Sequence, residues 1–545
     1  MTRPGVPLRE SYWPASAEIA LESTTCGGIL RAAAAEWSDA IALIDADGPP
    51  GARRHWTYAQ LHAAAERTAR ALGHRFAPGD HVAVWAANSP EWVILQFGLA
   101  LAGLVMVTVN PASRVAELGY VLRQSRARGV FHQRHYRGLD MAAAIAESGV
   151  ALDCVACLED LDAFVAAHDD GRALADVDPF APAMIQYTSG TTGRPKGALL
   201  NHFSVTNNAR MMALIKELGT HTVNLAVAPL FHTGGCVGGV LGSVQTGGAL
   251  LLPSAFDAES MLDLVAQERV TYTFAVPTML IALLNAQAAR PRDLSSLVTV
   301  FSGAATVPVE VVKRVEREFG ARLIIGYGQT ETSPAITHTR PDDAPADKSE
   351  TIGYALPQVE IKIVDPASGA TVPVDTPGEL CTRGFLVMMG YYDNPEATAA
   401  TIDADGWLHT GDLCTMDARG YVRITGRLKD MIIRGGENIY PREVEEVLYT
   451  HPAIADVAVI GLPDDYWGES VGAVLMVRDG QAVSAAALAA FCGERLARHK
   501  VPRQWFVVDA IPTTTSGKLQ KFRLLEMVRA GDLETARLPG PDPAG

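Results

Sequence analysis

Short runs of apolar residues recur along the first 330 residues, and amphipathic stretches long enough for helices separate most of them. Continuous apolar runs of this length are typical of strands buried on both faces of a largely parallel sheet. Their alternation with helices predicts a layered α/β architecture. We expect strands at 82–86, 104–109, 184–187, 223–228, 249–252, 272–276, 297–301 and 323–325, and helices at 261–267, at 310–319 and from a Thr57–Gln60 capping box to about residue 72.

The stretch from Trp92 to Val109 is apolar and has about the length of a membrane span. However, Gln96, Gly98 and Gly103 interrupt it, no cationic flank precedes it, and its second half is β-branched. The pattern therefore favours a buried helix followed by a buried strand.

The pattern changes after residue 341. Short alternating segments between Gly, Pro and Asp predict a β-rich subdomain over about 341–425, with strands at 359–364, 378–382 and 421–424. A small α+β unit of about 115 residues follows Gly426 and Arg427. In it we expect helices from Pro441 and at 485–496, and strands at 457–460, 473–477 and 505–508. The predicted domains are thus 1–426 and 427–545.

Composition narrows the possible classes. Of the 545 residues, 48% are hydrophobic and 20% are charged, which excludes a disordered chain, a collagen-like repeat and a coiled coil. The formal net charge of −15 argues against a general nucleic-acid binder, which needs a positive surface.

Seven scattered cysteines do not form a disulfide scaffold. Cys154 and Cys157 have the spacing of half a zinc or redox site, but no second Cys or His pair lies nearby at ligand spacing. The first fourteen residues lack the apolar core of a signal peptide. We therefore expect a reduced, cytoplasmic protein without an integral membrane segment, and leave peripheral membrane attachment open.

The strongest local motif is YTSGTTGRPKG at residues 187–197, directly after an apolar strand. Its glycines allow backbone N–H groups to approach an anion, four hydroxyls add donors, and Arg194 and Lys196 add charge. The spacing differs from that of a Walker A loop. The motif predicts a polyphosphate site that contains Thr188, Ser189, Gly190, Thr191, Thr192, Gly193 and Lys196.

This loop resembles the signature loop of the adenylate-forming superfamily, which includes acyl-CoA synthetases, adenylation domains of nonribosomal peptide synthesis and firefly-type luciferases. Further motifs follow in the family's order: PLFHTGG at 229–235, SGAA at 302–305, GYGQTE at 326–331, GWLHTGD at 406–412, GRLKDMIIRGGENIYPREVE at 426–445 and PTTTSGK at 512–518. The resemblance covers residues 25–525 or so. The motif sequences, especially GYGQTETSPA, are most similar to those of bacterial medium- and long-chain fatty acyl-CoA synthetases.

The resemblance implies a reaction in two steps. A carboxylate attacks the α-phosphorus of ATP and expels pyrophosphate, and a thiol, usually that of coenzyme A, then attacks the acyl-adenylate. Both steps develop negative charge on oxygen, so they need positioned cations and Mg²⁺. ATP, coenzyme A and a carboxylic acid are the implied partners.

The resemblance also assigns roles to single residues. Tyr327 and Gly328, with Gly303, Ala304 and Ala305, are implied around adenine. Thr330 is implied at the α-phosphate, and Glu331 with Thr188 at Mg²⁺. Asp412, supported by Arg427, is implied at the ribose.

Three C-terminal features are implied in the same way. Lys518 would neutralise the charge that develops during adenylation. Lys429, within a hinge at about 427–430, would be the pivot of a mobile C-terminal domain. Arg434, Gly435, Gly436 and Glu437 would face coenzyme A. Independently of the resemblance, seven Lys or Arg lie between 495 and 523 and could meet its phosphates, although the solvated face of an amphipathic helix explains part of this cluster equally well.

By resemblance His232 is the aromatic gate beside the substrate carboxylate. The segment after it, with Gly234, Gly235 and Gly238, is small and uncharged, which predicts a pocket for an apolar acyl or aryl chain. No acidic residue lies between Phe231 and Asp257 to pair an α-ammonium, so an amino-acid substrate is disfavoured.

Three functions stay open on the sequence. The first is an acid:CoA ligase for a medium- or long-chain fatty acid or a related acid, with an aryl acid as the alternative. The second transfers the acyl group to an amine or a carrier protein. The third is a nucleotide-binding protein without activity, against which Glu331, Asp412 and Lys518 argue. The oligomeric state is open, with a homodimer as one alternative.

Overall fold

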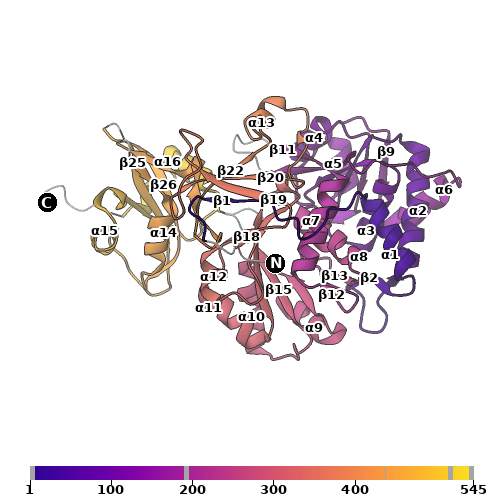
Figure 1. Ribbon diagram of the computed structural model, residues 1–545, viewed down its shortest axis with the longest axis horizontal. Helices are drawn as coiled ribbons and strands as arrows, with labels where there is room; N and C mark the ends of the chain where they lie inside the picture. Colours follow the sequence, from indigo (N-terminus) through magenta and orange to yellow (C-terminus); the bar gives the residue numbers. More distant parts are fainter. Residues whose placement is uncertain (1–6, 189–194, 436, 465, 513–518, 539–545) are drawn as a thin grey trace. The chain divides into compact units, whose positions relative to one another are not determined.

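The computed structural model describes residues 7–188, 195–435, 437–464, 466–512 and 519–538. The chain divides into two compact units (Figure 1). Unit 1 comprises residues 1–3, 13–361 and 381–409, and unit 2 comprises residues 4–12, 362–380 and 410–545.

The first sheet of unit 1 has seven strands in the order β21-β11-β10-β5-β4-β6-β9. The strands from β10 to β9 pair in parallel, whereas β11 and β21 are antiparallel to their neighbours. Their bounds are β4 His81–Trp85, β5 Val105–Val109, β6 Gly129–His132, β9 Cys154–Cys157, β10 Pro182–Thr188, β11 Lys196–Asn201 and β21 Gly390–Tyr391.

Helices cover both faces of this sheet (Figure 1). Val82 and Val84 of β4 pack with the helices of one face, and Ala83 and Trp85 pack with those of the other, because successive strand residues point to opposite sides. The first face carries α1 Cys26–Glu36, α2 Tyr58–Arg75, α3 Pro90–Leu101 and α6 Leu161–His168, and the second carries α4 Val115–Gln124 and α5 Met141–Glu147.

Local sequence explains where α2 begins and why α3 can pack closely against it. Thr57 caps α2, and the capping box with Gln60 forms as expected. Gly98 lets α3 approach α2 closely, since a Cβ there would lie 2.7 Å from the Thr68 side chain. The stretch from Trp92 to Val109 is buried as α3 and β5, which confirms its assignment as a helix followed by a strand.

The second sheet of unit 1 has nine strands in the order β18-β17-β16-β15-β14-β12-β13-β2-β3. The strands from β16 to β2 are parallel, and β3, β17 and β18 are antiparallel additions. Their bounds are β2 Ile41–Asp45, β3 His55–Thr57, β12 Val223–Leu225, β13 Ala249–Leu252, β14 Tyr272–Phe274, β15 Thr299–Gly303, β16 Arg322–Gly328, β17 Ala335–His338 and β18 Tyr354–Ala355.

One hydrophobic core joins the two sheets of unit 1. It contains residues of both sheets together with α1, α7 His202–Ile215, the π-helix η2 Gly234–Leu241 and α8 Gly242–Gln245. A separate core on the other face of the nine-stranded sheet is formed with α9 Ala258–Glu268, α10 Pro277–Ala289, α11 Val309–Arg314 and the π-helix η3 Val315–Phe319. Unit 1 also contains two short helices, α12 Pro345–Glu350 and α13 Pro395–Ala399, and a two-stranded sheet of β7 His135–Tyr136 and β8 Leu139–Asp140.

A five-stranded sheet has the order β1-β19-β20-β22-β23, and the division between the units falls within its strands. Its bounds are β1 Tyr12–Trp13, β19 Val359–Val364, β20 Gly378–Gly384, β22 Leu408–Met416 and β23 Val422–Arg427. This sheet corresponds to the predicted β-rich stretch.

The rest of unit 2 is an α+β fold. Its sheet runs β25-β24-β27-β26, with β28 parallel to β27. The elements are β24 Ile432–Arg434, β25 Glu437–Ile439, α14 Pro441–Tyr449, β26 Ile454–Asp464, β27 Gly468–Val477, α15 Ala485–Gly493, β28 Gln504–Val507 and α16 Lys521–Ala530. Val444 and Leu448 of α14 are fully buried in the core of this sheet.

The fold class predicted from the hydrophobic pattern is confirmed, and every strand expected from an apolar run is present, most of them with shifted ends. The expected helix at 310–319 is α11 followed by a π-helical turn. The predicted boundary between residues 426 and 427 separates a C-terminal domain that is expected to move relative to the rest. This boundary stays a prediction. Among the described residues, no helix is long and apolar enough to cross a membrane.

Candidate active site

The described ends of the phosphate loop lie opposite each other in unit 1. Thr188 ends β10, Lys196 begins β11, and the two residues are register partners in the antiparallel pair. The Tyr120 hydroxyl donates a hydrogen bond to the Pro195 carbonyl (2.9 Å) and so fixes the returning strand. The loop residues predicted to cradle phosphate, Ser189, Gly190, Thr191, Thr192 and Gly193, lie outside the described residues.

Glu331 contacts the end of β10. It belongs to the 3-10 turn η4 Thr330–Thr332, which follows β16, and it is only 8% exposed. The Tyr391 hydroxyl donates a hydrogen bond to Glu331 Oε1 (2.8 Å), and Thr188 Oγ1 lies 3.4 Å from the same oxygen. The Met388 N–H donates to the Glu331 carbonyl (2.9 Å), so side chain and backbone are both held.

Tyr391 links this carboxylate to the cation of the loop. Lys196 Nζ lies 5.0 Å from the centre of the Tyr391 ring, within the range of a cation–π contact. Burial, followed by the charge of Glu331 and the hydrogen bond to it, raises the pKa of Tyr391 well above its usual range. Tyr391 therefore keeps its proton and remains a donor to Glu331 at any physiological pH.

Sequence reasoning missed Tyr391. The only signal was its place in Gly390-Tyr391-Tyr392, sixty residues after Glu331, where the chain forms β21 on the edge of β11. Two adjacent tyrosines after a glycine indicate no chemistry by themselves. The contact depends on the sheet order, which places β21 beside the phosphate-loop strands.

The carboxylate of Glu331 has the character of a Mg²⁺ ligand. Oε1 accepts the hydrogen bonds from Tyr391 and Thr188, while Oε2 accepts none from the described residues, and no described cation forms an ion pair with the group. Mg²⁺ prefers hard oxygen donors, and a buried carboxylate with one unused oxygen is such a donor. The residues present thus fit the predicted pair of ligands, Glu331 and Thr188.

The residues predicted around adenine lie at the carboxyl ends of β15 and β16. Gly303 and Gly326 are register partners there, and a Cβ on Gly303 would lie 2.5 Å from the Gly326 carbonyl oxygen. A Cβ on Gly328 would lie 2.0 Å from the Pro334 carbonyl oxygen. Only glycine allows this close packing, which leaves Tyr327 half-buried between the two glycines of β16.

The neighbouring residues of these strand ends are accessible. Ala304 and Ala305 are exposed, and Ala304 adopts a positive φ of 67° directly after β15 ends. Thr330 is half-buried at the start of η4, next to Glu331. Unit 1 thus brings together Thr188, Lys196, Thr330 and Glu331, with the predicted adenine residues on the strands that lead into this turn.

Unit 2 brings together the predicted ribose residues. Asp412 and Arg427 are register partners in β22 and β23, and Arg427 Nε lies 2.9 Å from Asp412 Oδ1. Asp412 is buried, whereas the Arg427 side chain is half-exposed. Lys429 lies two residues further, in the 3-10 turn η5 Leu428–Asp430.

The loop predicted to face coenzyme A is a hairpin in which Arg434 pairs with Glu437 across β24 and β25. Arg434 is buried, its guanidinium lies 4.8 Å from the Trp467 ring centre, and its Nη1 donates to the His499 carbonyl (3.2 Å). Burial is the main cause that lowers the pKa of Arg434. Gly436 and Lys518 lie outside the described residues.

Trp467 is a second residue that sequence reasoning missed. A Cβ on Gly435 would lie only 2.6 Å from the Trp467 ring, and Gly435 has a positive φ of 60°. The ring therefore packs on both Arg434 and Gly435 and fixes the hairpin. The motif only indicated that a glycine-rich turn is present.

The predicted acyl segment is a π-helix, Gly234–Leu241, which begins directly after His232 and Thr233. The Gly235 and Cys236 N–H groups donate to the His232 carbonyl, and the Phe231 and His232 rings lie 4.2 Å apart. Gly235 is required there, because a Cβ would lie 2.3 Å from the Pro229 carbonyl oxygen. Gly234 is exposed and Gly238 half-buried, and a Cβ on either would meet no close atom.

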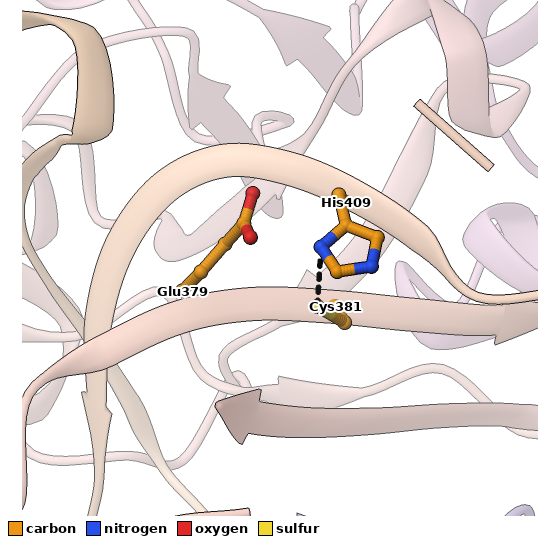
Figure 2. A group of neighbouring side chains, drawn as sticks. All are labelled: Glu379, Cys381 and His409. Carbon is orange, nitrogen blue, oxygen red and sulfur yellow. Dashed lines mark hydrogen bonds between the residues drawn. The ribbon is translucent and has the colours of Figure 1, made fainter. Parts of the chain in front are cut away.

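The cysteine pair has no metal-site geometry. Cys154 and Cys157 are free thiols at the two ends of β9, and the Cys157 thiol donates to Glu159 Oε2 (3.0 Å). Figure 2 shows a different set of potential ligands, Glu379, Cys381 and His409, on β20 and β22. Cys381 Sγ is hydrogen-bonded to His409 Nδ1 (3.4 Å), and Glu379 Oε1 accepts from the Gly411 N–H (3.0 Å). These hydrogen bonds explain the polar groups without a metal ion.

Comparisons with known proteins agree with this arrangement. The model of the AMP-binding enzyme family matches residues 30–392, and that of the AMP-binding enzyme C-terminal domain matches residues 443–518. The putative acyl-CoA synthetase YngI of Bacillus subtilis (strain 168) is 40% identical over 535 residues, covering 92% of this chain and 97% of that protein. The mitochondrial medium-chain acyl-CoA ligase ACSF2 of Homo sapiens is 33% identical, covering 87% and 83%.

Solved structures share the architecture. ATP-bound MatB from Rhodopseudomonas palustris superposes with a TM-score of 0.84 at 29% identity, covering 93% of this chain and 99% of the other. Layered α/β sheets and a buried carboxylate beside the two strands that flank the phosphate-loop motif agree with this architecture. The chain belongs to the AMP-binding enzyme family, and within it to the acyl-CoA synthetase branch.

Proposed function

We propose that this chain is an ATP-dependent carboxylic acid:CoA ligase that activates an apolar acid, a medium- or long-chain fatty acid or a related acid. In the first step a carboxylate oxygen bonds to the α-phosphorus of ATP, and the bond to the β-phosphate oxygen breaks to release pyrophosphate. In the second step the thiol sulfur of coenzyme A bonds to the acyl carbon, AMP leaves, and the thiol proton goes to solvent.

The observation that carries the proposal is the buried carboxylate of Glu331 beside the phosphate-loop strands. Its contacts with Tyr391 and Thr188 hold it at the point where β10 ends and β11 begins. Lys196 adds a positive charge on the same side, over the Tyr391 ring. Phosphoryl chemistry depends mainly on such positioned charge and needs no protein nucleophile.

Mg²⁺, when bound, supplies charge neutralisation on the phosphate oxygens. We assign Glu331 and Thr188 to hold it, because the free Glu331 Oε2 and the Thr188 hydroxyl are the described oxygen donors at this point. Tyr391 then acts by orienting Glu331 through its hydrogen bond. Thr330, one residue earlier, is assigned to donate a hydrogen bond to the α-phosphate.

The remaining roles rest on the family resemblance and on local geometry. Tyr327 is assigned to stack on adenine, with Gly303, Ala304, Ala305 and Gly328 as the surrounding backbone. The Asp412 carboxylate, oriented by Arg427, is assigned to accept hydrogen bonds from the ribose hydroxyls. Lys518 is assigned to the charge that develops during adenylation.

The acid is proposed to lie along the π-helix that follows His232. This segment is lined by small and apolar residues, and its exposed or half-buried glycines, Gly234 and Gly238, have no close neighbour at the Cβ position. An alkyl chain loses no hydrogen bond on entering such a pocket, whereas an α-ammonium would lose its water without gaining an anionic partner. His232 at the start of the segment is assigned to the carboxylate end.

A single screen tests the proposal. Pyrophosphate release is measured with saturated acids of increasing chain length, benzoate-type acids and amino acids, each with and without coenzyme A. We expect release with the apolar acids and AMP and acyl-CoA formation when coenzyme A is added. Preference for benzoate-type acids would instead establish an aryl-CoA ligase. Release without any coenzyme A-dependent product would point to another acceptor, and no release with any acid would contradict ligase activity.

A further inference from the structure

A cavity of about 170 Å³ lies in unit 1, at the amino ends of parallel strands of the nine-stranded sheet. The candidate active site lies at the opposite, carboxyl ends of these strands. Tyr272, Thr299 and Arg322 line the cavity, and they are register partners at the amino ends of β14, β15 and β16. Gly303 and Gly328, at the predicted adenine site, are the last residues of the same strands β15 and β16. The cavity is therefore a separate site and takes no part in the proposed reaction.

Lys216 lines this cavity from the loop that follows α7. Its side chain is almost completely buried, with 3% exposed, and its backbone N–H donates to the Met212 carbonyl (3.2 Å). Its Nζ lies 4.3 Å from the centre of the Phe301 ring and 5.3 Å from that of Tyr272. Among the described residues, Nζ has no hydrogen-bond acceptor and no carboxylate within ion-pair distance.

Such an ammonium is unusual because it carries three donors and a charge. The two aromatic faces attract the charge but offer no conventional hydrogen-bond acceptor. Buried charges are otherwise paired or hydrogen-bonded, since removing them from water is costly. Burial accordingly lowers the pKa of Lys216 to about 7. A core lysine kept only for packing would leave this cost without compensation.

The other polar groups of the cavity also suit an anion. The Arg322 guanidinium forms an ion pair with Glu217 (2.5 Å), and both line the cavity with Lys216 and His221. When Lys216 is protonated, the cations of Lys216 and Arg322 outnumber the single carboxylate of Glu217 by one charge. The buried Thr299 hydroxyl makes no hydrogen bond with a described residue and adds a further donor.

We propose that this cavity binds a small phosphate-type oxyanion, held by the Lys216 ammonium, the Arg322 guanidinium and the Thr299 hydroxyl. A tetrahedral oxyanion presents oxygens in several directions, which matches donors that come from a loop and two neighbouring strands. Charge-assisted hydrogen bonds to it would supply the acceptors that Lys216 lacks.

Binding of inorganic phosphate to the full-length protein tests the proposal without ATP, acid or coenzyme A. Calorimetric titration and the midpoint of thermal unfolding are measured at constant ionic strength for the wild type, Lys216→Met and Lys313→Met. Methionine is similar in size and removes the buried charge. Lys313 is a matched control because it lies half-exposed on α11 and pairs with Glu310 (2.9 Å).

We expect saturable phosphate binding and a rise of the unfolding midpoint in the wild type and Lys313→Met, because a ligand of the folded state stabilises it. Lys216→Met should weaken phosphate binding at least tenfold. The same titrations are repeated with pyrophosphate. An anion that binds in this cavity should lose affinity in Lys216→Met, whereas an anion that binds elsewhere on the protein should not.

The proposal is overturned if the wild type shows no saturable phosphate binding, or if Lys216→Met binds as tightly as Lys313→Met. Should Lys216→Met fail to fold, Thr299→Val and Arg322→Gln replace it, and unchanged binding in both overturns the proposal equally. Because no substrate is present, these outcomes are independent of whether the chain has the proposed ligase activity.

Discussion

At the scale of single residues, the phenol of Tyr391 positions the carboxylate of Glu331. Tyr391→Phe removes only the hydroxyl. A hydrogen bond to a charged group contributes about 1.5–3 kcal/mol, so we expect adenylation to slow by about ten- to hundredfold. The slowing should be accompanied by a higher Mg²⁺ requirement, measured as pyrophosphate exchange over a range of Mg²⁺ concentrations.

Tyr392→Phe is the matched control for this prediction. It removes the neighbouring hydroxyl, which makes no hydrogen bond with a described residue, while Tyr392 keeps its backbone bonds to Gly197 and Gln124. Exchange in Tyr392→Phe should stay near the wild-type rate. If both variants slow equally, the effect comes from packing and the positioning role of Tyr391 is wrong.

Glu331→Gln tests the proposed metal ligand itself. The amide has the same shape and keeps an oxygen acceptor for Tyr391, but it lacks the charge that a hard cation prefers. We expect a large loss of turnover, with Mg²⁺ dependence shifted to higher concentrations and an unchanged unfolding midpoint. A normal Mg²⁺ dependence in this variant would contradict the ligand role.

The sequence predicted most of these residues because their motifs are contiguous. Thr188, Lys196 and Glu331 were each expected at the site, and the structure brings all three together. Tyr391 and Trp467 could not be predicted, because the residues that they contact, Glu331 and Arg434, are far from them in the sequence. The roles of all the predicted site residues, Thr188, Lys196 and Glu331 as well as Asp412, Lys429 and Lys518, remain predictions.

At the scale of elements, glycines let the strand ends approach closely beside the predicted adenine site. A Cβ at Gly328 would lie 2.0 Å from the Pro334 carbonyl oxygen and 2.8 Å from Ala335 Cα. Backbone atoms cannot yield as a flexible side chain does, so Gly328→Ala must displace the turn before η4. Overpacking typically costs about 1–3 kcal/mol. We expect a lower unfolding midpoint and weaker ATP binding, measured by thermal unfolding with and without ATP.

Gly493→Ala serves as the control for this substitution. Gly493 ends α15, has no positive φ, and a Cβ there would meet no atom within 4 Å. Its unfolding midpoint should match or exceed that of the wild type, because alanine favours helix. A Gly328→Ala protein with unchanged midpoint and ATP affinity would show that the turn is not constrained.

The predicted hinge belongs to the turn η5. Proline fixes φ near −65°, so Lys429→Pro should trap a residue that must change conformation between the half-reactions. We expect pyrophosphate exchange to be retained better than acyl-CoA formation, both measured on one preparation. Lys429→Ala removes the same side chain without fixing φ and should retain both rates. Survival of both rates in Lys429→Pro would show that the chain does not pivot at this residue.

At the scale of the whole molecule, the buried Lys216 makes stability depend on pH. Its pKa is lowered from 10.5 to about 7 in the folded protein. Between these values the unfolded chain binds more protons, so stability should rise with pH, by at most about 1.4 kcal/mol per pH unit. Below pH 7 Lys216 is charged in both states and adds no slope.

Lys216→Met should lack this slope, so its advantage in unfolding midpoint over the wild type should be largest near pH 6–7 and shrink by pH 9. Glu217, His221 and Arg322 also line the cavity, and they are present in both proteins, so the difference isolates Lys216. The measurement uses buffers without phosphate, because a bound oxyanion would favour the charged lysine. Parallel pH profiles would show that Lys216 keeps an ordinary pKa.

The sequence by itself determined the alternation of strands and helices, the buried helix and strand at 92–109, and the order of the nucleotide motifs. These are local properties, set by hydrophobic period, capping and contiguous loop chemistry. Only the tertiary structure decided that β21 lies beside β11, so that Tyr391 meets Glu331. It also decided that Lys216 is buried against two aromatic rings, because both depend on strand order and packing between residues far apart in the chain.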